Sequence, residues 1–298
     1  MSAVCFSFAQ DAHIGRSLAR AIGAEHHDVE IHRFPDGETR VRLPVECAGK
    51  CVILVCGGHH PNTSALPLFF AAHAARAMGA SRIGLVAPYL AYMRQDTAFH
   101  AGDAVSARAY GQFLSRCFDW IVTVDPHLHR IRSLDEIFSI PAVNMSSMPA
   151  MSDWIAANVK DPVIIGPDSE STQWASSVAQ SMGVPWTVLH KIRTGDRQVS
   201  VSLPDPGLLR DRSPVIIDDI VSSGRTLVEA ANGLRSLTSR PVTCVVVHAL
   251  LAPEAEAAIK AAGVGRFVST NTVAHASNAI DVVPLLAERI RALLPHAS

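Results

Sequence analysis

Two adjacent carboxylates, followed closely by hydroxyls and a glycine, are the residues whose spacing points most directly to chemistry. Asp218 and Asp219 come at the end of an apolar, strand-like run that begins at Pro214. Carboxylate oxygens can accept hydrogen bonds from the vicinal hydroxyls of a sugar. The next residues offer hydroxyls, backbone N–H groups and a helix N-terminus to an anion. They are Ser222, Ser223, Gly224, Arg225 and Thr226. The stretch can hold a sugar phosphate, or it can simply cap a helix beside two solvated carboxylates.

Two cations stand on a second β-like run. Lys191 and Arg193 are separated by one residue, so they share a face of an extended strand. The runs 187–193 and 198–203 are joined by a polar turn, which predicts a hairpin or a mobile flap. A flap of this kind can bring positive charge onto phosphate oxygens and exclude water. The structural alternative is a basic strand edge that discourages aggregation.

A turn near the N-terminus combines an aromatic ring with two carboxylates. Phe34, Asp36 and Glu38 surround a Pro-Asp-Gly core between two strand-like pieces. The ring can stack on a base, and the carboxylates can bind its exocyclic amine. A plain β-turn explains the same residues without a ligand.

Another polar segment follows the buried strand-like run Arg82–Ala87. It contains Arg94, Gln95 and Asp96. An arginine at a strand end is suited to phosphate binding because its guanidinium is always charged and can donate two parallel hydrogen bonds. The alternative is an ion pair between Arg94 and Asp96 on the surface, which would contribute little to stability.

Two further strand ends offer ligands for a divalent cation. His127 follows the run Trp120–Val124, and Asp168 follows Pro162–Gly166. A neutral imidazole and a carboxylate can both contact an ion that is held mainly by phosphate oxygens. A single histidine at a strand end is more often only hydrogen-bonded, so neither residue identifies a metal site alone.

Apolar strand-like runs alternate with helical stretches along the whole chain, which is typical of parallel α/β sheets. Ligands bind at the carboxyl ends of such strands, where the polar segments above are found. A chain of 298 residues suits two domains. The segment 140–149, rich in Met, Ser and Pro, predicts a boundary between domains at 1–145 and 146–298. The two halves present strand, polar loop and helix in a similar order, which weakly indicates a duplication.

Composition narrows the functional class. Hydrophobic residues make up 48% and charged residues 18%, which predicts a globular chain. The formal charge of −1 gives no electrostatic reason to expect nucleic acid as a partner. The six cysteines form no Cys-x-x-Cys pair, which indicates reduced thiols and a cytoplasmic location. No secretion signal or membrane span is evident.

Taken in order, these segments resemble ribose-phosphate diphosphokinases, also called phosphoribosyl diphosphate synthetases, over essentially the whole chain. The acidic loop alone also resembles that of type I phosphoribosyltransferases. The shared motifs are a Phe-x-Asp-Gly-Glu turn, a His-Pro-x-Asn-like stretch, a Pro-Tyr-x-x-Tyr-x-Arg-Gln-Asp segment, Asp-x-His, Pro-Asp, a Lys-x-Arg flap and an Asp-Asp sugar-phosphate loop. Here they are Phe34–Glu38, His60–Asn62, Pro88–Asp96, Asp125–His127, Pro167–Asp168, Lys191–Arg193 and Asp218–Thr226.

The resemblance implies two phosphoribosyltransferase-like domains, each a mainly parallel sheet flanked by helices, with nucleotide bound by 1–145 and ribose phosphate by 146–298. It implies transfer of a diphosphoryl group from ATP to the anomeric hydroxyl of ribose 5-phosphate, with Mg²⁺ as cofactor and AMP released. A homo-oligomer is expected, either a dimer or a hexamer built from dimers.

Site residues are implied by the same motifs. ATP would be bound by Phe34, Asp36, Glu38, Arg94, Gln95 and Asp96. The metal-bound nucleotide would be contacted by His127 and Asp168. The transition state would be stabilised by Lys191 and Arg193, the ribose hydroxyls by Asp218 and Asp219, and the 5-phosphate by Ser222–Thr226.

The chain also departs from the family pattern. Residues 169–174 replace a small, glycine-rich turn with larger side chains, and Ser222 and Arg225 stand where an acidic residue and a glycine are frequent. Two other functions therefore remain open. A phosphoribosyltransferase would need the acidic loop but not the Phe34 turn. A non-catalytic regulatory paralogue would be expected to lose cations such as Lys191 and Arg193, which are retained.

Overall fold

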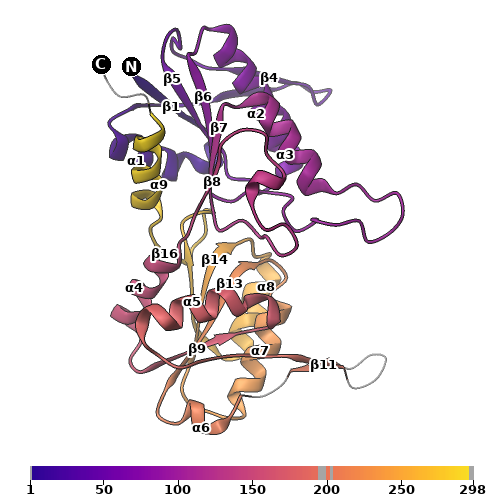
Figure 1. Cartoon of the computed structure of the whole chain (residues 1–298), viewed down its shortest axis with the longest axis vertical. Helices are drawn as coiled ribbons and strands as arrows, with labels where there is room; N and C mark the ends of the chain where they lie inside the picture. Colours follow the sequence, from indigo (N-terminus) through magenta and orange to yellow (C-terminus); the bar gives the residue numbers. More distant parts are fainter. Residues whose placement is uncertain (1, 194–198, 202–203, 295–298) are drawn as a thin grey trace. The chain divides into compact units, whose positions relative to one another are not determined.

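The computed structural model describes residues 2–193, 199–201 and 204–294 (Figure 1). By their contacts they form two compact units. The first contains Met1–Met145 together with Thr272–Ala274 and Val282–Ser298, and the second contains Ser146–Asn271 and His275–Asp281. This division differs from the sequence-based domains 1–145 and 146–298 at the C-terminus. The difference arises because the last helix, α9 (Val283–Leu293), packs against α1 (Ala12–Ile22) of the first unit.

A six-stranded parallel sheet forms the centre of the first unit, in the order β2-β1-β5-β6-β7-β8. Its strands are β1 (Ala3–Ser7), β2 (Glu25–Asp28), β5 (Cys51–Val55), β6 (Arg82–Ala87), β7 (Trp120–Val124) and β8 (Ala142–Met145). Helices α1 and α9 contact each other, as do α2 (Pro61–Ala77) and α3 (Ser106–Cys117), and Figure 1 shows the two pairs on opposite faces of the sheet. The interior strands β5 and β7 are buried throughout, as expected for strands covered on both faces.

The second unit has its own six-stranded parallel sheet, in the order β10-β9-β13-β14-β15-β16. Its strands are β9 (Pro162–Gly166), β10 (Trp186–Val188), β13 (Ser213–Val221), β14 (Val242–Ala249), β15 (Val264–Thr270) and β16 (Asn278–Ile280). The helices are α4 (Met148–Asn158), α5 (Thr172–Met182), α6 (Pro206–Leu209), α7 (Arg225–Arg235) and α8 (Pro253–Ala261). Helix α4 packs with α5, and α7 packs with α8. The predicted α/β fold with two mainly parallel sheets is confirmed.

Both units follow one plan. In each sheet, the strand that comes first in the sequence lies between the second and the third. An antiparallel hairpin is inserted between the second and third sheet strands in both units: β3 (Glu30–Arg33) with β4 (Thr39–Arg42), and β11 (Lys191–Arg193) with β12 (Val199–Val201). The strand order reverses between the first and third strands, which is where open α/β sheets bind ligands. This shared topology agrees with the duplication that the sequence weakly indicates.

A short 3-10 turn follows the first strand of each six-stranded sheet. Ala9–Asp11 follows β1, Ser169–Ser171 follows β9, and a third turn lies at Leu134–Glu136. All six cysteines are buried and free. Among the described residues, no helix combines the length and apolar character needed to cross a bilayer.

Candidate functional site

The acidic pair lies at the reversal point of the second sheet. The predicted strand ended at Asp218, but β13 continues to Val221 because its ladder with β14 extends to the pairs Ile220↔His248 and Val221↔Ala249. Asp218 and Asp219 are therefore strand residues. Asp168 follows β9, the neighbour of β13, so the three carboxylates lie at the carboxyl ends of two adjacent strands.

Like charges and burial act together on these carboxylates. Asp219 is buried, and its backbone N–H donates to Asp218 Oδ1 at 3.1 Å. Burial, followed by the charges of Asp219 and Asp168, raises the pKa of Asp218 well above its ordinary value. A cation or hydroxyl donors near Asp218 would offset the free-energy cost of ionising its carboxyl group. Oxygen ligands are also those that Mg²⁺ prefers, so the donor set fits that ion.

The loop after β13 brings backbone close to any ligand. Gly224 has φ of 69°, in the left-handed region that glycine tolerates best, and it directly precedes α7. A Cβ at this position would lie 3.0 Å from Ile259 Cδ1 and 3.5 Å from Ala255 Cβ. Both the backbone angle and the close approach of α8 therefore favour glycine. The first N–H groups of a helix have no partner within it, so the start of α7 suits an anion.

Hydroxyls and a cation border the same turn. Ser222 and Thr226 are partly exposed, and Ser223 and Arg225 are exposed. Arg225 is the first residue of α7. The structure thus brings Asp168, Asp218, Asp219 and the predicted sugar-phosphate loop to one edge of the second sheet.

The segment that departs from the family pattern forms an ordered turn. Asp168 Oδ1 accepts a hydrogen bond from the Glu170 backbone N–H at 3.1 Å, and Ser171 completes a capping box around Asp168. Trp174 is buried on the same face of α5 as Ala175. Of residues 169–174, only Ser171 and Trp174 are buried, and the other side chains are exposed.

The predicted flap is a hairpin. Strand β11 pairs antiparallel with β12, in the register Lys191↔Val201 and Arg193↔Val199. The side chains of Lys191 and Arg193 lie outside what the structure describes, as do residues 194–198. Their roles stay predictions.

In the first unit, the turn of Phe34 joins β3 to β4. The Phe34 N–H donates to the Glu38 carbonyl at 2.8 Å, and the Glu38 N–H donates to Asp36 Oδ1 at 3.1 Å. The Gly37 N–H donates to the Phe34 carbonyl at 3.0 Å, which is the bond of a β-turn at the tip of the hairpin. Phe34 is 41% exposed, and its ring meets His32 edge-on at 4.6 Å. The turn belongs to the hairpin and not to the sheet.

The segment after β6 is fixed by a residue that sequence analysis did not single out. The Arg130 backbone N–H and Nη1 donate to the two Asp96 carboxylate oxygens at 3.0 and 2.9 Å. Burial alone would raise the pKa of Asp96, but the bonds and charge of Arg130 outweigh it and lower the pKa. Asp96 thus pairs with Arg130, while Arg94 is exposed. Spacing gave no signal for Arg130, since it lies 34 residues from its partner.

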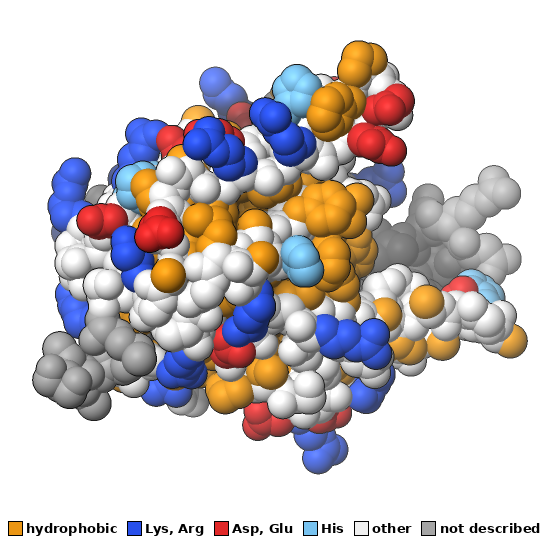
Figure 2. Space-filling view, turned by 90° about the horizontal axis from the view of Figure 1, so that it is seen from above, with side chains coloured by type: hydrophobic (Ala, Val, Ile, Leu, Met, Phe, Trp, Pro, Cys, Tyr) orange, Lys and Arg blue, Asp and Glu red, His pale blue; other side chains and the backbone are white. Residues whose placement is uncertain are grey.

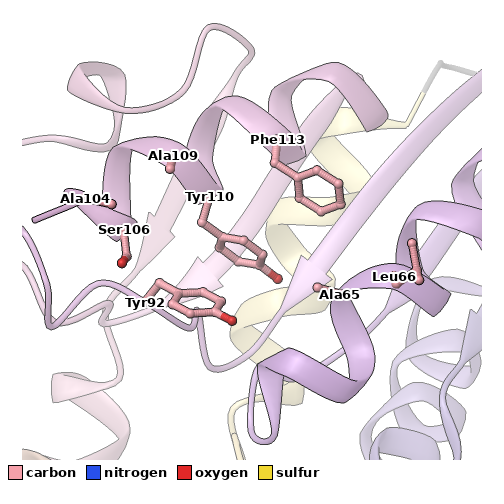
Figure 3. A pocket seen from close by; sticks show the side chains of 8 residues that line it. All are labelled: Ala65, Leu66, Tyr92, Ala104, Ser106, Ala109, Tyr110 and Phe113. Carbon is pink, nitrogen blue, oxygen red and sulfur yellow. The ribbon is translucent and has the colours of Figure 1, made fainter. Parts of the chain in front are cut away.

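Gln95 borders an aromatic pocket. Ser106 Oγ donates to Gln95 Oε1 at 2.6 Å, and Ser106 lines a pocket of about 410 Å³. Figure 3 shows its walls, which are Ala65, Leu66, Tyr92, Ala104, Ser106, Ala109, Tyr110 and Phe113. The wall residue Leu66 is 55% exposed, and nearby Phe69, whose ring contacts Phe113, is 38% exposed. Figure 2 shows hydrophobic side chains gathered on one face of the protein.

His127 follows β7, the strand beside β6. Its ring meets that of His129 edge-on, with centroids 4.0 Å apart. Arg130, in the same loop, holds Asp96. The first unit therefore brings Arg94, Gln95, Asp96 and His127 to the carboxyl ends of two neighbouring strands, with Arg130 joining the two loops.

Comparisons with known proteins agree with this arrangement. A profile of the N-terminal domain of ribose phosphate pyrophosphokinase matches residues 3–117, and a phosphoribosyl transferase domain profile matches residues 133–277. A ribose-phosphate pyrophosphokinase of Methanopyrus kandleri is 34% identical over 94% of this chain and 96% of its own. One from Halobacterium salinarum is 33% identical over 93% of this chain and 96% of its own.

A solved structure is similar over nearly the whole chain. The phosphoribosylpyrophosphate synthetase of Mycobacterium smegmatis superimposes with a TM-score of 0.84 at 23% identity, covering 98% of this chain and 99% of that one. This likeness shows the fold. The matching family profiles, and sequence relatives whose length this chain spans almost completely, show that the chain belongs to the ribose-phosphate pyrophosphokinase family.

Proposed function

We propose that this protein transfers the β,γ-diphosphoryl group of ATP to the anomeric hydroxyl of ribose 5-phosphate, releasing AMP. The observation that carries the proposal is the edge of the second sheet, where two strand carboxylates precede a glycine loop and a helix N-terminus. Carboxylates suit a diol, and the loop suits a phosphate. That pairing matches a pentose phosphate.

On the sugar side, Asp218 and Asp219 accept hydrogen bonds from the two ribose ring hydroxyls. The 5-phosphate lies against the turn Ser222–Thr226, where backbone N–H groups and hydroxyls donate to its oxygens. Arg225 adds a cation at the start of α7. These contacts fix the ring so that the anomeric hydroxyl is oriented for attack on the β-phosphorus.

On the nucleotide side, Arg94 and Gln95 contact ATP, and Asp96 acts by holding Arg130. In that ion pair Arg130 Nη1 contacts the carboxylate at 2.9 Å, the carboxylate is buried and much of the guanidinium stays exposed. A cation oriented in this way can donate to phosphate oxygens. Phe34 offers an exposed ring for stacking on adenine, and Asp36 and Glu38 offer acceptors for its amine.

Phosphoryl transfer requires alignment and charge neutralisation more than covalent participation by the protein. Lys191 and Arg193, at the base of the β11–β12 hairpin, neutralise charge on the transferred group. Mg²⁺ would supply a further positive charge on the phosphate oxygens, with Asp168 and His127 as its protein contacts. The acidic residues of the second unit favour this ion, because Asp168 adds to the charge that raises the pKa of Asp218.

The protein is further proposed to form a homo-oligomer, a dimer or a hexamer built from dimers. The exposed Leu66 and Phe69 support self-association, since contiguous apolar surface commonly marks an interface. Light scattering with Leu66→Glu and Phe69→Glu tests this part separately. Unchanged mass for both variants would exclude this surface as the interface.

The experiment for the activity is direct. Purified protein is incubated with ATP, Mg²⁺ and ribose 5-phosphate, and AMP is measured with and without the sugar. Sugar-dependent AMP together with phosphoribosyl diphosphate supports the proposal. AMP formed without the sugar, or no AMP with any of several pentose phosphates, would contradict it, and the second result would favour a regulatory role.

A further inference from the structure

A chain of hydrogen bonds in the second unit joins a helix to the loop before β16. His275 Nε2 lies 2.8 Å from Glu256 Oε1 on α8, and His275 Nδ1 lies 2.7 Å from Ser277 Oγ. Ser277 Oγ lies 2.7 Å from Ser269 Oγ at the end of β15. The Asn278 amide donates to Ser269 Oγ at 2.9 Å and to the Thr270 carbonyl at 2.6 Å.

The hydrogen bonds around His275 show which nitrogen of its ring carries the proton. The Ser277 backbone N–H donates to His275 Nδ1 at 3.1 Å, so Nδ1 is an acceptor and carries no proton. The proton of the neutral ring is therefore on Nε2, which donates it to the Glu256 carboxylate. Among the residues joined by these hydrogen bonds, Glu256 alone belongs to a helix. The connections fasten α8 to the end of β15 and to β16.

Helix α8 also forms the wall behind the sugar-phosphate loop. Its buried residues Ala255 and Ile259 are those that a Cβ at Gly224 would meet. Ala255 is adjacent to Glu256 in the sequence, and Ile259 is three residues further, nearly one turn on. A shift of α8 therefore changes the surface against which Gly224 packs.

The apolar face of α8 is packed in the core, where Ala255 and Ile259 are 5% and 2% exposed. A pocket of about 310 Å³ lies beside the helix, lined by side chains that include Ile259, Phe267 and His275. The Glu256–His275 hydrogen bond lies beside this pocket, so it adds a polar connection to a helix that is also held by its buried face.

We propose that Glu256 and His275 are positioning residues for ribose 5-phosphate binding, acting through α8 on the Gly224 loop. The inference rests on the proposed function, since it assigns the loop to the sugar phosphate. Neither residue is expected to touch the substrate. Their loss should weaken sugar binding while leaving nucleotide binding and the transfer step intact.

A pair of variants at Glu256 tests the inference. Glu256→Ala removes the acceptor for His275 Nε2–H, whereas Glu256→Gln retains an amide oxygen that can accept it. We expect Glu256→Ala to raise the Kd of ribose 5-phosphate, measured by calorimetry, about fivefold, as for the loss of a hydrogen bond of about 1 kcal/mol. Its KM for the sugar should rise in parallel, with kcat and the KM for ATP unchanged. Glu256→Gln should restore the wild-type Kd.

The control is Glu254→Ala, an exposed acidic residue in the first turn of the same helix. It should bind the sugar like the wild type. Equal Kd values for wild type and Glu256→Ala would overturn the inference, as would an equal rise in the KM for ATP or a failure of Glu256→Gln to rescue. Wild-type protein that does not bind ribose 5-phosphate would instead overturn the proposed function.

Discussion

The two units build the same loop from different residues. After the third sheet strand, β5 leads into α2 and β13 leads into α7, and the residue before each helix is left-handed, with φ of 60° at His60 and 69° at Gly224. Strand β5 is wholly apolar, whereas β13 carries Asp218 and Asp219. The fold thus supplies an open turn at the reversal of strand order in both sheets. The side chains decide which ligand each turn can hold.

The ends of the first strands differ in a similar way. Asp11 and Asp168 both belong to or border a 3-10 turn after the first sheet strand. Asp168 is partly exposed, whereas Asp11 is 1% exposed, and in the described part of the chain its Oδ2 has no hydrogen-bond partner. Burial raises the pKa of Asp11 to about 7, against a smaller opposing effect of the Gly57 N–H. One carboxylate is available to ligands, and the other is enclosed by its own unit.

The sharpest test of the comparison removes the charges that distinguish β13. Replacing Asp218 and Asp219 together with asparagine should lower kcat/KM for ribose 5-phosphate about 1000-fold, because amides are poorer acceptors for hydroxyls. Steady-state AMP release measures the effect. Thr63→Ala, in the first turn of α2 after the corresponding loop, should stay within about twofold of the wild type. Comparable losses in both variants would remove the functional distinction between the two loops.

The hairpins provide the second test, since one is proposed to act in the transition state and the other in nucleotide binding. Lys191→Ala should lower kcat about 100-fold by removing a positive charge from the transferred group. Phe34→Ala should instead raise the KM for ATP about tenfold with a smaller change in kcat, because a stacking contact is present before and during the reaction. Initial rates over a range of ATP concentrations separate the two. A near-normal rate for Lys191→Ala would reject its assignment.

Asp11 allows a test by pH. Its folded pKa lies above that of an unfolded aspartate, so the folded state binds more protons between about pH 4 and 7, and stability falls as pH rises through that range. Asp11→Asn keeps an oxygen for the Gly57 N–H but cannot ionise. Between pH 5 and 8 it should therefore gain about 2 to 3 kcal/mol relative to the wild type. Urea denaturation at both pH values measures this difference, which a pH-independent offset would contradict.

The smallest effects come from the left-handed positions. Gly224→Ala should destabilise the protein by about 1 to 2 kcal/mol, because alanine is strained at this φ and its Cβ meets Ile259. It should also raise the KM for ribose 5-phosphate. His60→Gly relieves the same strain but increases the entropy of the unfolded chain, so a change within about 1 kcal/mol is expected. Urea denaturation measures both changes. A larger loss of stability for His60→Gly than for Gly224→Ala would contradict the expectation.

The sequence predicted the interior of the fold better than its edges. Buried strands such as β6 and β7 are apolar runs of the right length, and each was recognised. The edge strands β2, β8 and β16 were not, because they are short and partly exposed and so lack an apolar signal. Strand β8 even falls inside the segment 140–149, which was interpreted as the domain boundary.

The candidate site shows the same limit. Asp218 and Gly224 were recognised because their local spacing carries the chemistry. Arg130 was not, since its role depends on a pairing with Asp96 that only the fold creates. The link from His275 through α8 to Gly224 was also invisible, because it joins three separate segments by packing and hydrogen bonds.

The return of α9 to the first unit has a consequence for how the protein is made. Its residues Leu286 and Ile290 are fully buried, and Arg291 donates to the Ala21 carbonyl at the end of α1. The ribosome releases this helix only after the second unit has been synthesised. We therefore expect the nascent first unit to expose the apolar face of α1 throughout translation, and chaperones to be needed at the beginning of the chain longer than at its middle.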